Sequence, residues 1–320
     1  MSDATPYVLT DDVDPQVRQF VDAINEGYVA AEKTSSGTLE ERRAIGERVR
    51  QPWIAGGPKM AETTDFEAHG VRCRLYRPID QNNLPVMLYI HGGGWVLFSI
   101  DTHDRLMREY ACRAGIAVIG IDYSRAPESK FPVALDEIVT VAGWVRDHCD
   151  DLGVDAGRMV LGGDSAGGNL TVAACLKLRE LGQPPVQAML LNYGAFSAER
   201  TASYTDFGGP NYCLTPDEMD AFWNDYLDDP SQQSTDPLVA PLHAELHDLP
   251  PAFVAIAPLD ILADCNRAMA KKLRNAGVPV MEVEYEGATH SFLEAVSIAS
   301  LAQRAFDDQA KWLQKTLNML

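Results

Sequence analysis

The sequence predicts an α/β protein whose central, mostly parallel sheet is covered by helices on both faces. Apolar runs of strand length alternate with segments of helical apolar spacing through most of the chain. Residues 85–90 are continuously apolar, as expected for a strand that is buried on both faces, and residues 186–192 are also expected to form a buried strand. Glycine-rich turns follow two of the expected strands, at residues 92–94 and 162–168.

Length and composition limit the classes of function. The 320 residues can form one large domain or two smaller ones, and 46% hydrophobic with 23% charged residues is ordinary for a globular protein. The formal net charge of -19 would repel phosphate backbones and anionic membranes, so we expect neither nucleic acid nor a membrane as a partner. The six cysteines lack paired spacing, which favours free thiols over disulfides or a zinc site.

The first 55 residues predict a helical segment ahead of the α/β core. Asp14 followed by Pro15 predicts the start of one helix, and Thr38 with Glu41 three residues later predicts the start of another. The first strand is expected only at residues 71–76. The N-terminal residues lack the pattern of a secretion signal, and no apolar stretch reaches membrane-spanning length, so we expect a cytoplasmic protein.

Residues 56–196 and 235–320 are expected to form the core, and residues 197–234 interrupt it. Within this insertion, a capping box from Thr215 to Glu218 opens a helix with one aromatic face. We interpret the insertion as a cap above the sheet, and the alternative is a helix that only packs against the core. Beyond it, the strand and helix pattern resumes at residues 252–257 and ends in a long helix.

Residues 163–167, Gly-Asp-Ser-Ala-Gly, lie where an expected strand turns sharply into an expected helix. They fit the G-x-S-x-G nucleophile elbow, in which glycines relieve backbone crowding and leave the serine hydroxyl exposed above the positive end of a helix. The same pentapeptide also arises by chance, and glycine-rich turns of this kind also bind phosphates. Other parts of the chain therefore have to decide whether Ser165 is a nucleophile.

A nucleophilic serine needs a base to remove its proton and an acid to orient that base. Among the seven histidines, His290 alone lies downstream of Ser165 in a loop directly after an expected strand, which makes it the candidate base. Asp260 and Asp264 compete for the role of the acid. Asp260 is favoured because it follows the strand at residues 252–257, whereas Asp264 is expected to cap the next helix.

The reaction also needs N–H donors where the carbonyl oxygen becomes negative. The glycine run after the strand at residues 85–90 brings backbone close to whatever lies above the sheet edge. We therefore expect the N–H groups of Gly93 and Gly94, with that of Ala166 after the serine, to form an oxyanion hole. His91 is expected to brace this loop rather than to titrate in catalysis.

These residues occur in an order that resembles one known family. Residues 91–95 (His-Gly-Gly-Gly-Trp), residues 122–128 (Asp-Tyr-Ser-Arg-Ala-Pro-Glu), the elbow, the two aspartates and His290 look like the motifs of the bacterial hormone-sensitive-lipase-like esterases, called family IV. The resemblance runs from about residue 71 to the final helix. It implies an α/β-hydrolase fold with a helical cap and hydrolysis of carboxylic esters with no metal or other cofactor. Family members often dimerise through an edge strand, so a homodimer is also an expectation.

The chain departs from the family pattern at three places, which comprise four residues. Ile261 stands where the family usually has proline, Ser291 stands where glycine is usual, and Ser124-Arg125 replaces the common Arg-Leu. None of these changes removes a reacting group. Ile261 and Ser291 adjoin the expected triad, so they bear on substrate preference and on loop geometry.

The leading hypothesis is a serine esterase that acts on a small molecule, a short-chain or small aromatic ester, through an acyl-enzyme. One alternative is an amidase or aryl-formamidase that uses the same triad. Another alternative is a ligand receptor on a disabled hydrolase fold, as occurs among plant relatives of the family. Analogy of fold alone is weak evidence for such a function. Such receptors lose a triad residue, whereas Ser165, Asp260 and His290 are all present.

Aromatic side chains of the two cap segments are expected to roof the cleft above Ser165. A bulky roof limits the depth of the cleft, so we expect acyl chains from acetyl to about hexanoyl to be preferred. The side chains expected in this roof are Phe20, Tyr28, Phe222, Trp223 and Tyr226.

Overall fold

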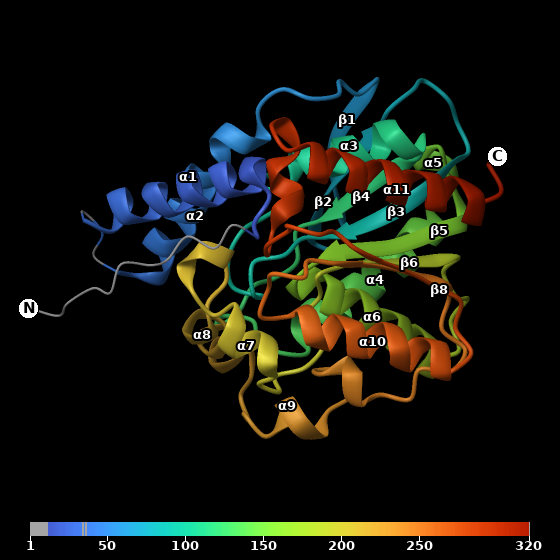
Figure 1. The fold of residues 1–320 in the computed structure, drawn as a ribbon. Helices are drawn as coiled ribbons and strands as arrows, with labels where there is room; N and C mark the ends of the chain where they lie inside the picture. The colour runs from blue at the N-terminus through green and yellow to red at the C-terminus, as the bar shows by residue number, and fades with distance from the viewer. Residues whose placement is uncertain (1–11, 34, 36, 320) are drawn as a thin grey trace, which may run out of the picture.

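The computed structural model describes residues 12–33, 35 and 37–319, and within them one twisted sheet forms the centre of the molecule (Figure 1). Its strand order is β1-β2-β4-β3-β5-β6-β7-β8, with β1 and β2 antiparallel to their neighbours and all other pairs parallel. The predicted α/β class is confirmed. The strands are β1 (Glu62–Ala68), β2 (Val71–Arg77), β3 (Leu84–Ile90), β4 (Ala117–Ile121), β5 (Val154–Asp164), β6 (Ala188–Asn192), β7 (Ala252–Ile256) and β8 (Val280–Glu284).

Helices cover both faces of the sheet (Figure 1). In β3, Val86 and Leu88 point to the face covered by α4, α6 and α10, while Met87 and Tyr89 point to the face covered by α3 and α11. Because both faces are buried, the strand is continuously apolar. The α-helices are α1 (Pro15–Glu32), α2 (Leu39–Ile54), α3 (Asp104–Ala114), α4 (Val133–Asp147), α5 (Cys149–Leu152), α6 (Ala166–Glu180), α7 (Ala202–Asp206), α8 (Pro216–Tyr226), α9 (Gln232–Thr235), α10 (Ala263–Asn275) and α11 (Ser300–Thr316).

Strand β1 lies ahead of the first strand that the sequence predicts, at residues 71–76. It occupies the edge of the sheet and most of its residues are exposed, so it lacks the apolar run of a buried strand. Asp65 on β1 instead forms ion pairs with Arg72 and Arg74 of β2. Exposed pairs of this kind stabilise little, and they leave no hydrophobic pattern to detect.

The two N-terminal helices start where the sequence predicts. The Asp14 carboxylate accepts hydrogen bonds from the N–H groups of Gln16 and Val17, and Thr38 Oγ1 accepts one from Glu41 N–H. Residues 1–11 of the expected N-terminal segment lie outside the described residues. Helices α1, α2, α7 and α8 lie at the same end of the molecule, on the left of Figure 1.

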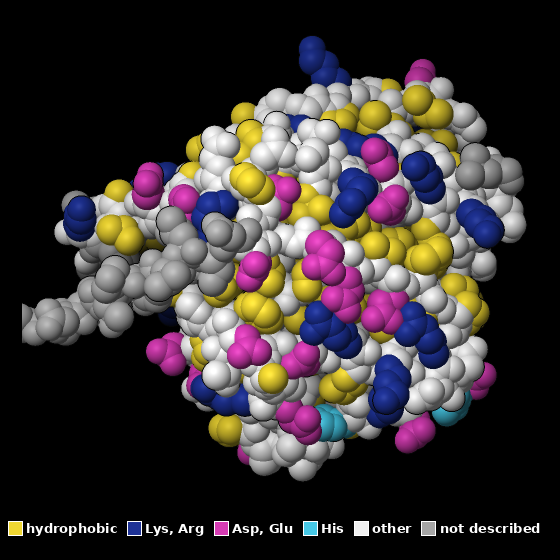
Figure 2. Space-filling model, viewed as in Figure 1, with side chains coloured by type: hydrophobic (Ala, Val, Ile, Leu, Met, Phe, Trp, Pro, Cys, Tyr) yellow, Lys and Arg dark blue, Asp and Glu magenta, His cyan; other side chains and the backbone are white. Residues whose placement is uncertain are grey.

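On the face shown in Figure 2, acidic and basic side chains alternate and no broad basic patch is visible. None of the helices in the described part of the chain is both long and apolar enough to cross a membrane.

Candidate active site

The loops that follow β3, β5, β7 and β8 meet at the carboxyl edge of the sheet, where ligands of open parallel sheets bind. Beyond the regular pairing of β7 with β8, Leu259 and Thr289 form one further parallel bridge. This bridge places the two residues that follow, Asp260 and His290, side by side. Asp260 thus lies in a loop past the end of β7, which stops at Ile256, and not directly at the strand end as we expected.

Ser165 stands at the sharp turn between β5 and α6, with φ 54° and ψ -118°. This backbone conformation is strained for a residue with a side chain, and strain of this kind concentrates at functional sites. The turn is possible because Gly167 has no Cβ, which would overlap the carbonyl oxygen of Ile90. The N–H of Ser165 donates to Asn192 O at 2.9 Å, which fixes the turn to β6.

His290 joins Ser165 to Asp260. Its Nε2 lies 3.0 Å from Ser165 Oγ and its Nδ1 lies 2.7 Å from Asp260 Oδ2. Burial alone would lower the pKa of His290, but the charge and hydrogen bond of Asp260 outweigh burial and raise it. Asp260 is only 1% exposed and also accepts a hydrogen bond from Leu262 N–H at 3.0 Å, so its carboxylate is firmly held. The structure brings together the three side chains that the sequence singled out.

Asp264 lies apart from this group. Its carboxylate accepts a hydrogen bond from Ser203 N–H at 3.1 Å and pairs with Arg267 at 3.0 Å. The expectation that Asp264 caps α10 is wrong, because the N-cap residue is Leu262 and Asp264 lies inside the first turn. It instead ties α10 to the start of α7, through Ser203.

The glycine loop after β3 lies beside Ser165. Within the described part of the chain, no group accepts a hydrogen bond from the N–H of Gly93, Gly94 or Ala166, so all three donors are available. Gly94 has φ 61°, and a Cβ there would overlap the ring of Phe222. His91 braces the loop: its Nδ1 donates to Gly92 O at 2.7 Å, and burial with the neighbouring His103 lowers its pKa to about 3.

A second histidine–aspartate pair lies beneath the elbow, and sequence reasoning missed it. Asp164 accepts hydrogen bonds from Tyr89 OH at 2.8 Å and from His103 Nε2 at 3.3 Å, and all three side chains are buried. Burial opposes both charges, yet their attraction outweighs it, so the pKa of His103 is raised and that of Asp164 is lowered. Chain order gives no reason to single out His103, because it precedes Ser165 in the sequence. The signal for the pair was Asp164 itself, an acid inside the elbow pentapeptide.

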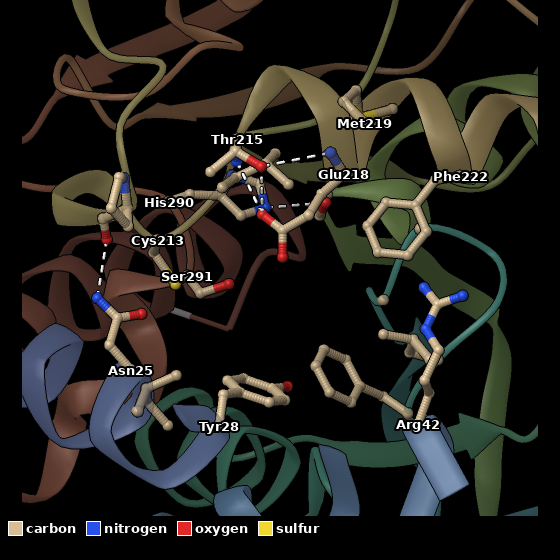
Figure 3. Close-up of a pocket in the computed structure, with 18 of the residues that line it drawn as sticks. Asn25, Tyr28, Arg42, Cys213, Thr215, Glu218, Met219, Phe222, His290 and Ser291 are labelled. Atoms are coloured by element: carbon tan, nitrogen blue, oxygen red, sulfur yellow. Dashed lines mark hydrogen bonds between the residues drawn. The ribbon is translucent and has the colours of Figure 1, made fainter. Parts of the chain in front are cut away.

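A cavity of about 730 Å³ opens above Ser165 and His290. Figure 3 shows side chains from α1, α2 and α8 around it, among them Tyr28, Arg42, Met219 and Phe222. Tyr28 and Phe222 therefore line the cavity as expected.

The other three expected roof residues do not line this cavity. Phe20 packs edge-on against Trp53, with ring centroids 4.8 Å apart. Trp223 and Tyr226 pack on Trp95 of the glycine loop, each with ring centroids 4.4 Å apart. Helix α8 thus lines the cavity with Met219 and Phe222 and packs against the core with Trp223 and Tyr226.

The departures from the family pattern have structural consequences. Ser291 adopts φ 61°, the left-handed region that glycine favours, so its backbone is strained where the family pattern has glycine. Ile261 is buried beside Asp260. The N–H and hydroxyl of Ser124 both donate to Glu137, at 2.6 Å each, which anchors the turn after β4 to α4.

The arrangement can carry out acyl transfer. It combines a hydroxyl on a strained residue that lines the cavity, an imidazole within hydrogen-bond distance, a buried carboxylate that orients the imidazole and free N–H donors nearby. In the described residues, no group of three or more histidine, cysteine, aspartate or glutamate side chains is placed to hold a metal ion.

Comparisons with known proteins agree with this chemistry. A family model described as alpha/beta hydrolase fold matches residues 87–294. An acetyl esterase of Salmonella dublin is 33% identical over 284 residues, which are 87% of this chain and 87% of that protein. A hyperthermophilic esterase from the archaeon Pyrobaculum calidifontis superposes with a TM-score of 0.87 at 32% identity, covering 95% of this chain and 98% of that one. A thermostable esterase from Pseudomonas putida gives a TM-score of 0.87 at 30% identity, covering 97% and 99%. The chain therefore belongs to the α/β-hydrolase fold family and is a carboxylic-ester hydrolase of the hormone-sensitive-lipase-like group.

Proposed function

We propose that Ser165, His290 and Asp260 form the catalytic triad of this esterase and that its substrates are short-chain or small aromatic esters. His290 Nε2 takes the proton from Ser165 Oγ as this oxygen attacks the ester carbonyl carbon. Asp260 holds the Nδ1–H of His290 and stabilises the imidazolium that forms. The N–H groups of Gly93, Gly94 and Ala166 donate to the carbonyl oxygen as it becomes negative.

The two halves of the reaction use the same groups. When the tetrahedral intermediate collapses, the bond to the alcohol oxygen breaks and His290 returns its proton to that oxygen, which leaves an acyl group on Ser165. Water then attacks the acyl carbon while His290 removes a water proton. Collapse of the second intermediate releases the carboxylic acid, and Ser165 regains its proton from His290.

The preference for short acyl chains is supported by the cavity and by the relatives. Phe222 lies against Gly94 at the expected oxyanion hole, so the space near the reacting carbon is narrow. The Salmonella proteins that resemble this chain are named acetyl esterases. A chain that reaches the cavity wall must displace packed side chains, at a cost of about 1–3 kcal/mol.

The observation that carries the triad is the pair of contacts of His290, 3.0 Å to Ser165 Oγ and 2.7 Å to Asp260 Oδ2. Its test is Ser165→Ala, assayed with p-nitrophenyl acetate. Loss of the nucleophile lowers turnover by about 10⁴-fold or more. A folded Ser165→Ala variant with near-normal turnover would contradict the proposal.

The amidase or aryl-formamidase alternative is not favoured, because the similar proteins named above are esterases. Parallel assays with an ester and its matched amide test the preference directly. The receptor alternative is not favoured either, since all three triad side chains are present and in contact.

We also propose the roles of the remaining segments. Residues 1–55 and 197–234 are the two parts of a cap over the core, a division supported by the side chains of α1, α2 and α8 around the cavity. A cytoplasmic location is supported by six cysteines that are all free. A homodimer through the free edge of β8 is supported by the exposed Met281 on that edge strand, and light scattering in solution tests it.

A further inference from the structure

A buried ion pair joins the N-terminal helices to the loop that carries His290. Arg50 of α2 and Glu294 of the 3-10 segment η3 (Phe292–Ser297) are each 4% exposed, and Arg50 Nε donates to Glu294 Oε2 at 3.1 Å. Arg50 Nη1 also donates to Tyr28 OH at 2.5 Å, and the guanidinium lies 4.3 Å from the ring centre of Phe98. One side chain therefore contacts α1, the segment after the glycine loop and the segment after His290.

Stability alone is a weak reason for this pair. Removing two charges from water is costly, and apolar side chains of similar volume often replace a buried ion pair without loss of stability. Here Arg50, Glu294, Tyr28 and Phe98 all line the same cavity as Ser165. The ion pair thus lies in the wall of the cavity that contains Ser165, where its charges and its position can affect the reaction.

Glu294 is linked to His290 through a short strained turn. The N–H of Glu294 donates to Ser291 O at 2.9 Å, and Ser291 has φ 61°. A residue with a side chain stays in this region only where its surroundings hold it. Because Arg50 binds Glu294, it holds the far side of the turn on which the His290 ring depends.

We propose that Arg50 is a positioning residue for ester hydrolysis, which acts by binding Glu294 when the N-terminal helices are docked and so fixes the His290 loop. The inference rests on the proposed role of His290 as the base. The other titratable groups that face Arg50, Glu294 and the imidazole come from several neighbouring elements: Tyr28 on α1, His103 at the start of α3, Asp164 on β5, Tyr193 after β6, Cys213 after the 3-10 segment Pro210–Tyr212, Glu218 on α8 and Asp260 after β7.

Replacing Arg50 and replacing Glu294 should shift the pH–rate profile in opposite directions, because the two side chains carry opposite charges. Burial disfavours the imidazolium form of His290, Asp260 outweighs that effect, and the negative charge of Glu294 adds to the rise in pKa. Replacing Arg50 with a neutral residue leaves this carboxylate without its cation, so the acid limb of the pH–rate profile moves to higher pH. Replacing Glu294 with glutamine removes the carboxylate charge, so the limb moves to lower pH.

The experiment compares Arg50→Met, Glu294→Gln, the double variant and the matched control Arg48→Met, which lies exposed on the same helix. The value of kcat/KM for p-nitrophenyl acetate is measured across the acid-to-neutral range, and circular dichroism checks folding. We expect Arg50→Met to lose roughly tenfold to a hundredfold at neutral pH, because a misplacement of about 1 Å in an active site costs on the order of a hundredfold. Arg48→Met should match the unchanged protein.

The two single variants should displace the acid limb in opposite directions, and the double variant should lie between them. If the variants lose activity but the acid limb moves in neither of them, the pair is only structural and the proposal is overturned. A normal pH–rate profile of Arg50→Met would also overturn the proposal. If Arg50→Met does not fold, Arg50→Lys retains the charge and must retain the position of the limb. Labelling with a fluorophosphonate separates the hypothesis of the triad from the hypothesis about Arg50. If Ser165 is not the labelled residue, the triad itself is wrong. If Ser165 is labelled but the acid limb of the pH–rate profile does not move in the variants, only the role of Arg50 is refuted.

Discussion

Replacing Asp260 with asparagine should nearly abolish turnover, while the same change at Asp264 should leave it almost intact. Asp260 is buried and accepts the Nδ1–H of His290 at 2.7 Å. An amide there has no charge to stabilise the imidazolium and allows the tautomer with the wrong nitrogen protonated. The expected loss is about 10⁴-fold in kcat, which corresponds to roughly 5.5 kcal/mol of transition-state stabilisation.

At Asp264, the side chain is 32% exposed, and its pairing with Arg267 is exposed to a similar degree. An exposed pair contributes only about 0–1 kcal/mol to stability. Asp264→Asn should therefore lower the melting temperature slightly and change kcat by less than about threefold.

The assay is steady-state hydrolysis of p-nitrophenyl acetate by both variants, with circular dichroism to confirm folding. Titration of active sites with a fluorophosphonate corrects for the fraction of competent enzyme. The assignment of Asp260 as the acid is refuted if folded Asp264→Asn has the lower kcat of the two variants, or if Asp260→Asn retains a tenth or more of the normal kcat.

Three further predictions concern pH, metal and acyl length. Because only neutral imidazole accepts the proton of Ser165, kcat/KM should rise with pH as His290 deprotonates. The pKa of His290 is raised, so the midpoint of this rise should lie above the ordinary histidine value of about 6.5. A midpoint below that value would contradict the assignment of His290 as the base. Dialysis against EDTA should leave kcat unchanged, and loss of activity that a divalent ion restores would defeat the mechanism. Across p-nitrophenyl esters, each added methylene should lower the activation free energy by about 0.8 kcal/mol, which raises kcat/KM roughly fourfold, and kcat/KM should fall sharply beyond about hexanoyl. Phe222→Ala should move that maximum to longer chains, whereas a steady rise in the unchanged protein would exclude a closed pocket.

The core of the fold could be predicted from sequence because its signals are local. Strands buried on both faces are continuously apolar, and the helix starts at Asp14 and Thr38 depend on side chains within three residues. Strand β1 gave no such signal, since it is an exposed edge strand held by backbone pairing and surface ion pairs.

The grouping of Ser165, Asp260 and His290 could also be predicted, because chain order and strand ends place these residues at one edge of the sheet. The side chains of α1 and α8 that line the cavity could not be predicted. Apolar residues at helical spacing share one face of a helix, and the spacing does not show which of them line a cavity and which pack against Trp95. The ion pair of Arg50 with Glu294 lay equally beyond reach: its partners are 244 residues apart, and neither belongs to a motif.

The central claim is that Ser165 carries the acyl group during turnover. Rapid acid quenching of the enzyme with p-nitrophenyl acetate, followed by mass spectrometry of the digested protein, tests it most directly. We expect an acetyl group on the peptide that contains Ser165, which accumulates with the initial burst of p-nitrophenol and is absent from Ser165→Ala. An acetyl group on a different residue, or normal turnover by Ser165→Ala, would contradict it.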